Sequence, residues 1–274
     1  MGAMNDRPRA STDPALLAGR AYRDGRPLEA RQNLYAYQRP RFDLPGLVLH
    51  HAGDRDGLWV DVGCGNGRYL ERIRAARPRA HVVGMDLSAA LLRTLSGPVV
   101  CADAARLPLR TGSAEVVLAM HMLYHLPDPA HAVAEAARVL TPGGVLVAST
   151  NARDDKAELD RWWSRAAGTV LGTGHGPRRV KLSDRFPLHQ APHLLESCFD
   201  EVTVIDLHGR IQVDDPAPVL AHYASYRAWA HQTGVPFDQT LAQLEKDLQA
   251  RAARGPLTIT THQGLLIARR PHTP

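Results

Sequence analysis

A glycine-rich segment limits the fold of this 274-residue chain more than any other feature. It reads Val60-Asp-Val-Gly-Cys-Gly-Asn-Gly-Arg68, with glycines spaced as G-x-G-x-G between an apolar run and an amphipathic stretch. Such a loop needs glycine for the tight turn, for close approach of a ligand, and for a helix that starts near the sheet. The segment therefore predicts a strand, a ligand-binding loop and a helix at the carboxyl edge of an open α/β sheet.

Apolar runs alternate with amphipathic segments along most of the chain. We expect strands at about 58–62, 80–85, 99–101, 115–120, 145–149, 201–207 and 258–269. Helices are expected between them, including one that begins at the Asp128-Pro129 pair, where a carboxylate cap precedes proline in the first turn. This order predicts an α/β fold with a Rossmann-like, seven-stranded, mostly parallel sheet and helices on both faces.

The regular alternation does not extend over the whole chain. Residues 1–27 are polar and contain several Pro and Gly, so we expect a flexible N-terminal segment. The remainder, 28–270, is expected to form a single domain whose cofactor-binding half covers about 58–150. Three less regular stretches are expected to supply a helical cap or insertion, at about 28–45, 156–198 and 214–255.

The composition narrows the class of partner. The formal net charge is +5, but the basic residues are dispersed and do not form a patch, so a nucleic-acid partner is not favoured. Three widely separated cysteines predict neither a disulfide framework nor a metal site. No apolar stretch approaches the ~20 residues of a membrane span. We therefore expect a cytoplasmic protein with no membrane partner.

Two familiar phosphate-binding patterns fit the glycine segment poorly. A dinucleotide loop, G-x-G-x-x-G, requires glycine at position 68, which is Arg68, and no Gly-Lys-Ser/Thr follows as in a phosphate loop. Asp61 lies two residues before the first glycine, where it would repel pyrophosphate and attract an ammonium or sulfonium group.

Two further acids follow the next two strands. Asp86 lies ~20 residues after the glycines, the position of a carboxylate that binds ribose hydroxyls. Asp103 ends the third strand, where it can accept a hydrogen bond from an adenine amino group while Leu87 and Leu107 sandwich the ring. The spacing thus predicts a nucleoside with a cationic substituent as the ligand.

Taken with these acids, the motifs resemble those of the class I S-adenosylmethionine-dependent methyltransferases, specifically the broad group that acts on small molecules. The segments that carry the resemblance are Val60–Arg68, Val83–Ser88, Asp103–Pro108, Met120–Asp128 and Arg138–Gly144. They cover about residues 58–150. The resemblance implies S-adenosyl-L-methionine as cofactor and an enzyme of the EC 2.1.1 class.

The resemblance also implies cofactor roles for particular residues. Asp61 and the loop of Gly63, Cys64, Gly65 and Gly67 would line the methionine end, with Met120 and His121 near it. Asp86 would meet the ribose and Asp103 the adenine, with Leu87 and Ala104 also among the cofactor-binding residues. Tyr35 or Arg39 would meet the cofactor's carboxylate, since their segment resembles an N-terminal element that closes over the cofactor in relatives.

The loop after the fourth strand supplies the candidate catalytic residues His125, His121 and Tyr124. A general base assists a hydroxyl acceptor by roughly 10²–10⁴-fold. The alternative is that these side chains shape the pocket and move no proton.

The function expected from the sequence is methyl transfer to an O or N nucleophile of a small molecule, with secondary metabolites as one candidate class. Two alternatives stay open: an RNA methyltransferase, and a non-catalytic module that binds the cofactor for regulation. The sequence does not fix the acceptor or the oligomeric state, for which a homodimer is one option.

Overall fold

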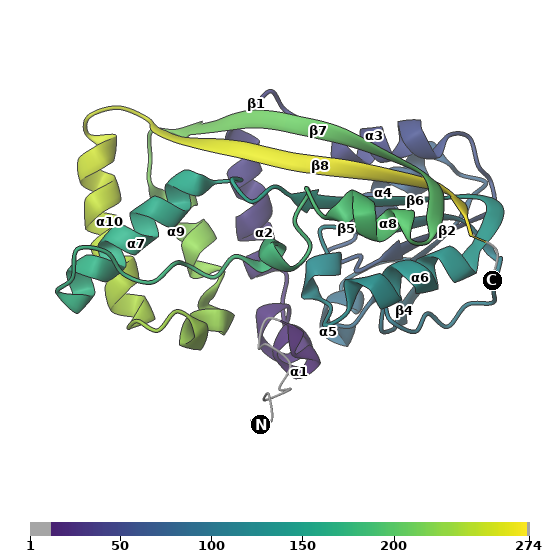
Figure 1. Cartoon of the computed structure of the whole chain (residues 1–274), viewed down its shortest axis with the longest axis horizontal. Helices are drawn as coiled ribbons and strands as arrows, with labels where there is room; N and C mark the ends of the chain where they lie inside the picture. Colours follow the sequence, from purple (N-terminus) through teal and green to yellow (C-terminus); the bar gives the residue numbers. More distant parts are fainter. Residues whose placement is uncertain (1–11, 273–274) are drawn as a thin grey trace.

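A computed structural model describes residues 12–272 and places eight strands in one mixed sheet. The strands are β1 (Gln38–Arg39), β2 (Leu58–Val62), β3 (His81–Asp86), β4 (Val99–Cys101), β5 (Ala114–Met120), β6 (Leu140–Asn151), β7 (Phe199–Val213) and β8 (Leu257–Pro271). Their order is β1-β7-β8-β6-β5-β2-β3-β4 (Figure 1). Strands β2 to β6 pair in parallel, whereas β8 runs antiparallel to both β6 and β7.

The Rossmann-like fold is therefore confirmed, but the expected seven strands are eight. The additional strand is β1, which pairs antiparallel with β7 through Gln38 and Ile211. Two residues are too few for an alternating pattern to appear in the sequence, and the pairing partner lies far along the chain.

Helices cover both faces of the sheet, as expected. Helices α3 (Leu44–Ala52) and α4 (Arg68–Ala76) pack on one face, and α6 (Pro129–Val139) and α8 (Ala191–Glu196) pack on the other. The strands suit this arrangement because both of their faces are apolar. In β2, for example, Val60 faces one cluster and Trp59 the opposite one, the pattern of a parallel sheet buried on both sides. Helix α8 thus belongs to the sheet layers, although 156–198 was expected to be cap.

A helical cap is built on the outer halves of β7 and β8. On the N-terminal side of Gln263, β8 does not pair with β6. This part of β8 pairs with β7 alone, as far as the pair Val213 and Leu257. Helices α7 (Ala157–Leu171), α9 (Ala217–Ala224) and α10 (Phe237–Ala252) pack against this extension, at the end of the molecule opposite the C-terminus (Figure 1). The predicted insertion between the last two strands is thus present, over residues 214–256.

The N-terminal segment differs from the expectation of flexibility over 1–27. Residues 1–11 lie outside the described part, but Pro14–Leu16 (α1) and Leu17–Ala21 form short helical turns. The side chains of Leu17 and Ala21 are buried with Trp229. Leu17 and Ala21 thus pack with a residue more than 200 positions away in the chain, and local composition does not reveal such packing. Helix α2 (Arg26–Asn33) and a 3₁₀ turn over Leu34–Tyr37 then lead into β1.

Among residues 12–272, none of the helices combines the length and the apolar character required to cross a bilayer.

Candidate cofactor and acceptor site

A cavity of about 580 Å³ lies at the carboxyl ends of β2, β3 and β5. Most of the predicted site residues line it: Tyr35, Gly63, Cys64, Gly65, Asp86, Leu87, Asp103, Ala104, Met120, His121, Tyr124 and His125. Three predicted residues do not, namely Arg39, Asp61 and Gly67. The topology thus brings together residues from four separate strand ends and from the N-terminal segment.

The glycine loop forms the floor of this cavity. The amides of Gly63 and Cys64 both donate to the Met85 carbonyl, over 2.7 and 3.0 Å, and so fasten the loop to β3. Gly63 and Gly65 have φ values of +71° and +53°, which side-chain-bearing residues adopt only with strain. A Cβ at Gly65 would also lie 2.9 Å from Leu28 Cδ2 of helix α2, so the absence of side chains leaves the loop backbone open between sheet and helix.

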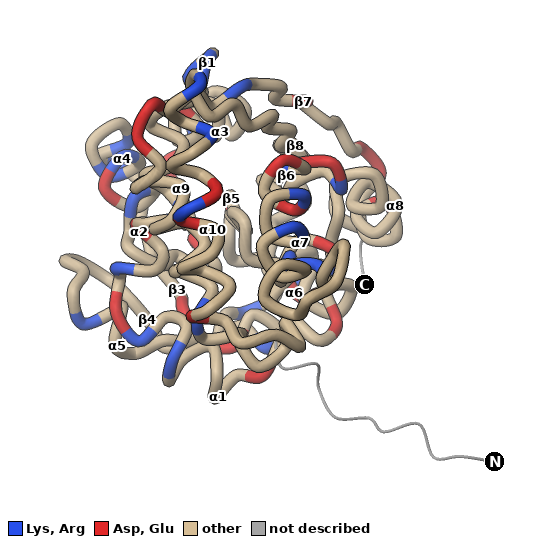
Figure 2. Tube along the Cα trace, turned by 90° about the vertical axis from the view of Figure 1, so that its left-hand side faces the viewer, with Lys and Arg blue, Asp and Glu red and all other residues tan. Residues whose placement is uncertain are grey.

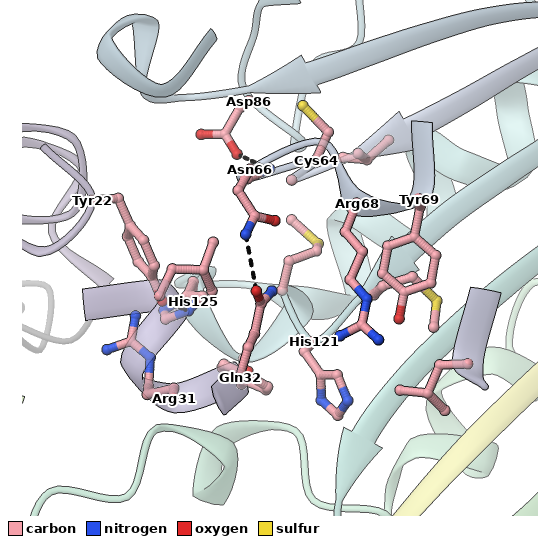
Figure 3. A pocket seen from close by; sticks show the side chains of 18 of the residues that line it. Tyr22, Arg31, Gln32, Cys64, Asn66, Arg68, Tyr69, Asp86, His121 and His125 are labelled. Atoms are coloured by element: carbon pink, nitrogen blue, oxygen red, sulfur yellow. Dashed lines mark hydrogen bonds between the residues drawn. The ribbon is translucent and has the colours of Figure 1, made fainter. Parts of the chain in front are cut away.

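Asp86 ends β3 with its carboxylate held by backbone amides. Its Oδ2 accepts from Gly65 N over 2.9 Å and its Oδ1 accepts from Ser88 N over 2.8 Å (Figure 3). Burial raises the pKa of Asp86, and these amide hydrogen bonds act against that rise. Each carboxylate oxygen has room for a further hydrogen bond, so the group can accept from both hydroxyls of a ribose.

Asp61 is buried below the glycine loop and does not line the cavity directly. Its side chain is 1% exposed, and no hydrogen-bond partner within residues 12–272 reaches Oδ2. Burial, assisted by the charge of Asp86, raises the pKa of Asp61 to about 8. An unpartnered buried acceptor is costly, so this oxygen suits a cationic ligand group that reaches it through the open loop.

Asp103 lies at the end of the third predicted strand, at the margin of the cavity. It is exposed, its Oδ1 accepts from Ala105 N over 2.9 Å, and Ala104 beside it is buried. Leu87 lines the cavity as expected, but Leu107 packs in the sheet core instead. Leu126, from the loop after β5, lines the cavity in its place.

The loop after β5 begins with a strained residue. His121 has φ +53°, and its amide donates to Ser149 of β6, to O over 3.2 Å and to Oγ over 3.0 Å. Burial, together with the charge of Lys156, lowers the pKa of His121 to about 4. The imidazole is therefore neutral at pH 7.

His125 belongs to an aromatic cluster in the cavity wall. Its Nε2 is 2.7 Å from Tyr22 Oη, and its ring lies edge-on to Tyr22 and Tyr124 and parallel to Trp229. Burial raises the pKa of both Tyr22 and Tyr124, so both phenols remain neutral at pH 7. The arrangement fits either of the two expected roles, a proton acceptor or a shaper of the pocket.

Arginines other than Arg39 face the cavity. Arg39 is exposed on β1 and donates to the Gln38 carbonyl, whereas its neighbour Gln38 is buried and lines the cavity. Successive strand residues point to opposite sides, and the sequence alone did not indicate which of the two points inward. Arg41 and Arg68 line the cavity, and Arg68 projects into it beside Tyr69 (Figure 3).

The N-terminal segment closes the site on the side opposite the sheet. Gln32 Oε1 accepts from Asn66 Nδ2 over 2.9 Å (Figure 3). Ser88 Oγ donates to the Tyr22 carbonyl over 2.8 Å. Tyr35 Oη accepts a hydrogen bond from Lys156 Nζ, which also pairs with Asp155. Lys156 lines the cavity but was not identified from the sequence, because nothing near it in the chain marks a site.

One group outside the cavity has metal-ligating side chains. Asp206, His208 and His262 bring ligand atoms within 4.8 Å of one another on β7 and β8. Asp206 and His208 are exposed, and His262 Nε2 is already 2.8 Å from Asp206 Oδ1. The sequence did not indicate this cluster, because two strands distant in the chain form it.

Comparison with known proteins agrees with the geometry. Residues 60–148 match the family model described as a methyltransferase domain. A ubiquinone biosynthesis O-methyltransferase of Marinobacter nauticus is 35% identical over 137 residues, 44% of this chain and 57% of that protein. A 27-O-demethylrifamycin SV methyltransferase of Amycolatopsis mediterranei is 38% identical over 114 residues, 38% of this chain and 40% of that protein. The chain thus matches only about half of these relatives' lengths.

Among solved structures, a presumed methyltransferase from Bacillus halodurans superposes with a TM-score of 0.55 and 18% identity. The superposition covers 84% of this chain and all of the other, so the likeness concerns the fold of nearly the whole molecule. The matched family model, the fold and the row of strand-end carboxylates agree, and they identify residues 60–148 as a domain of the class I S-adenosylmethionine-dependent methyltransferase type.

Proposed function

We propose that this protein transfers the methyl group of S-adenosylmethionine to an oxygen or nitrogen nucleophile of a small molecule. The observation that carries the proposal is the buried Oδ2 of Asp61 beneath an open glycine loop, for which residues 12–272 supply no hydrogen-bond partner, with Asp86 at the next strand end. In their ionised form these acids suit a nucleoside with a cationic substituent and repel a pyrophosphate.

The residues around the cavity fit the parts of that cofactor. Asp61 and the loop from Gly63 to Gly65 would face its ammonium and sulfonium groups, Asp86 the ribose, and Asp103 the adenine. The cofactor's carboxylate would meet Arg68, which projects into the cavity, with Arg41 near it. When bound, the sulfonium supplies a methyl group that is already activated for attack by a nucleophile.

The chain itself would contribute orientation and proton acceptance. Holding the nucleophile in line with the methyl and excluding water provides several kcal/mol without covalent chemistry. We assign proton acceptance to His125, whose hydrogen bond with Tyr22 fixes the ring at the cavity wall. His121, with its pKa lowered to about 4, is too weakly basic for efficient proton transfer near pH 7, so we assign it a positioning role.

Several observations support a small acceptor over RNA. The cavity volume lies in the range of small-molecule sites. Lys and Arg are interspersed with Asp and Glu along the described trace (Figure 2), whereas binding to a phosphate backbone requires concentrated positive charge. One relative's name refers to rifamycin, which supports a secondary metabolite as one candidate acceptor class.

Calorimetry and a product assay together test the proposal. We expect S-adenosylhomocysteine to bind, and a panel of phenols and amines incubated with S-adenosylmethionine to yield methylated product and S-adenosylhomocysteine in equal amounts. Binding of NADH or ATP without binding of S-adenosylhomocysteine would refute the proposal. Cofactor binding without turnover of any acceptor would favour the non-catalytic module.

A further inference from the structure

A side chamber of about 40 Å³ adjoins the main cavity. Arg31, Lys156 and His222 line both spaces, so these three side chains face the cavity as well as the chamber. About 10–15 Å³ of such volume holds one water molecule, so the chamber accommodates about three non-hydrogen atoms. That is the size of a carboxylate group.

The walls of the chamber carry more cations than carboxylates. Lys156 pairs with Asp155, and Arg179 Nε lies 2.7 Å from Asp160 Oδ1. Arg31 has no carboxylate partner among the described residues; its Nη1 donates to the Ser225 carbonyl, and its Nη2 is buried without a hydrogen-bond partner.

Lys181 adds a further cation to this wall. It lies 3.5 Å from Asp160, which it shares with Arg179, and the exposed Asp184 is nearby. No ion pair joins Asp160 or Asp184 to Arg31 within residues 12–272, so no carboxylate partner offsets the positive charge of Arg31, which lines both spaces.

Aromatic rings hold Arg31 in place. Its guanidinium carbon lies 5.1 Å from the Tyr22 ring centroid, 5.4 Å from that of Tyr226 and 5.8 Å from that of Trp229. A fixed, planar guanidinium with a free N–H is suited to a planar carboxylate. Arg31 lies on the opposite side of the pocket from Arg68 and Tyr69 (Figure 3).

His222 provides a second polar group at the same place. Its side chain is 3% exposed, and within residues 12–272 neither ring nitrogen has a hydrogen-bond partner. Burial, reinforced by the charges of Lys156, Arg179 and Arg31, lowers the pKa of His222. The neutral ring retains one N–H that is free to donate.

We propose that the methyl acceptor bears a carboxylate which binds in this side chamber, with Arg31 as the principal donor and His222 as the second. The inference rests on the proposed function and narrows its substrate class. Because Arg31 and Arg68 lie on opposite sides of the pocket, the carboxylates of acceptor and cofactor are held by different arginines.

Benzoate is a suitable probe for the carboxylate site, and benzamide is the uncharged compound of the same size. Protein saturated with S-adenosylhomocysteine would be titrated calorimetrically with each compound. We expect benzoate to bind at least tenfold more tightly than benzamide. Arg31→Gln should abolish this preference while S-adenosylhomocysteine affinity stays within about twofold, and Arg31→Lys should retain part of it. Arg178→Gln, an exposed position beside Arg179, is the matched control and should change nothing.

The outcomes separate the two proposals. Failure to bind S-adenosylhomocysteine in the unaltered protein would count against the proposed function. Normal S-adenosylhomocysteine binding with equal affinity for benzoate and benzamide would overturn the carboxylate site alone. Weaker S-adenosylhomocysteine binding by Arg31→Lys, in a protein with an unchanged melting temperature, would also overturn it, because Arg31 would then serve the cofactor. Tighter binding of phenyl phosphate than of benzoate would overturn the assignment to a carboxylate.

Discussion

The Oδ2 atom of Asp86 accepts a hydrogen bond from the Gly65 amide over 2.9 Å, which joins the end of β3 to the glycine loop at the end of β2. One carboxylate therefore both orders the loop and faces the cavity.

We expect Asp86→Asn to weaken S-adenosylhomocysteine binding by about 10- to 100-fold. A hydrogen bond to a charged group contributes about 1.5–3 kcal/mol, and 1.4 kcal/mol corresponds to a factor of ten. Isothermal calorimetry measures the change. Asp56→Asn is the control, since Asp56 forms only an exposed ion pair with Arg79, over 2.7 Å. Equal effects of the two substitutions would contradict the assigned role.

Cofactor binding should release protons near pH 7 through Asp61. With a pKa of about 8 this carboxyl is mostly protonated in the ligand-free protein, and a cationic ligand favours its ionised form. Affinity should therefore rise with pH up to about 8 and then level off. Calorimetry at pH 7 in buffers of different ionisation enthalpy measures the release, which Asp61→Asn should abolish. Equal release by the variant would show that another group is responsible.

The same group should make stability depend on pH. A carboxyl whose pKa is raised by folding stabilises the protein fully below its unfolded pKa of about 3.9, and this contribution is lost as the pH rises through about 8. Urea unfolding at pH 5 and pH 8.5 should show a larger loss of stability for the unaltered protein than for Asp61→Asn. An equal loss of stability in both proteins would show that a group other than Asp61 causes the pH dependence.

Gly65→Ala tests the open backbone of the loop. Gly65 and Gly112 both have positive φ, +53° and +65°, but a Cβ at Gly112 meets nothing within 4 Å. Each substitution should cost about 1–2 kcal/mol of stability, measured by urea unfolding, because L-residues are strained there. Only Gly65→Ala should also weaken S-adenosylhomocysteine binding. If Gly112→Ala weakened it equally, general destabilisation would explain both.

The two histidines of the loop after β5 should differ in their kinetic effects. For a hydroxyl acceptor, His125→Gln should lower kcat by about 10²-fold or more and remove the acidic limb of the pH–rate profile. His121→Gln should act mainly on KM, because the neutral His121 ring positions a ligand and accepts no proton. Steady-state kinetics between pH 5.5 and 9 distinguishes the two. A pocket-shaping role for His125 would leave the pH profile unchanged in His125→Gln.

The sequence predicted the parts of the site that depend on local pattern. Asp86 and Gly65 could be located because strand ends and glycine spacing are encoded within a few residues, and parallel strands bring their carboxyl ends to one edge. Arg39 was named beside Tyr35 for the cofactor's carboxylate, but Arg39 does not line the cavity, because β1 is too short for its inward face to be read from alternation. Arg31, Lys156 and His222 could not be assigned, because their meeting depends on how the cap packs on the outer halves of β7 and β8.

The unbroken pairing of β7 with β8, from Phe199 and Pro271 to Val213 and Leu257, bears on how molecules enter and leave. A backbone hydrogen-bond ladder that runs through both halves of the molecule resists bending. The helical cap is therefore poorly suited to a hinge motion relative to the rest of the sheet. We therefore expect ligand entry and release to require displacement of the segment from Thr12 to Tyr37, which contacts the glycine loop through side chains and contains no strand.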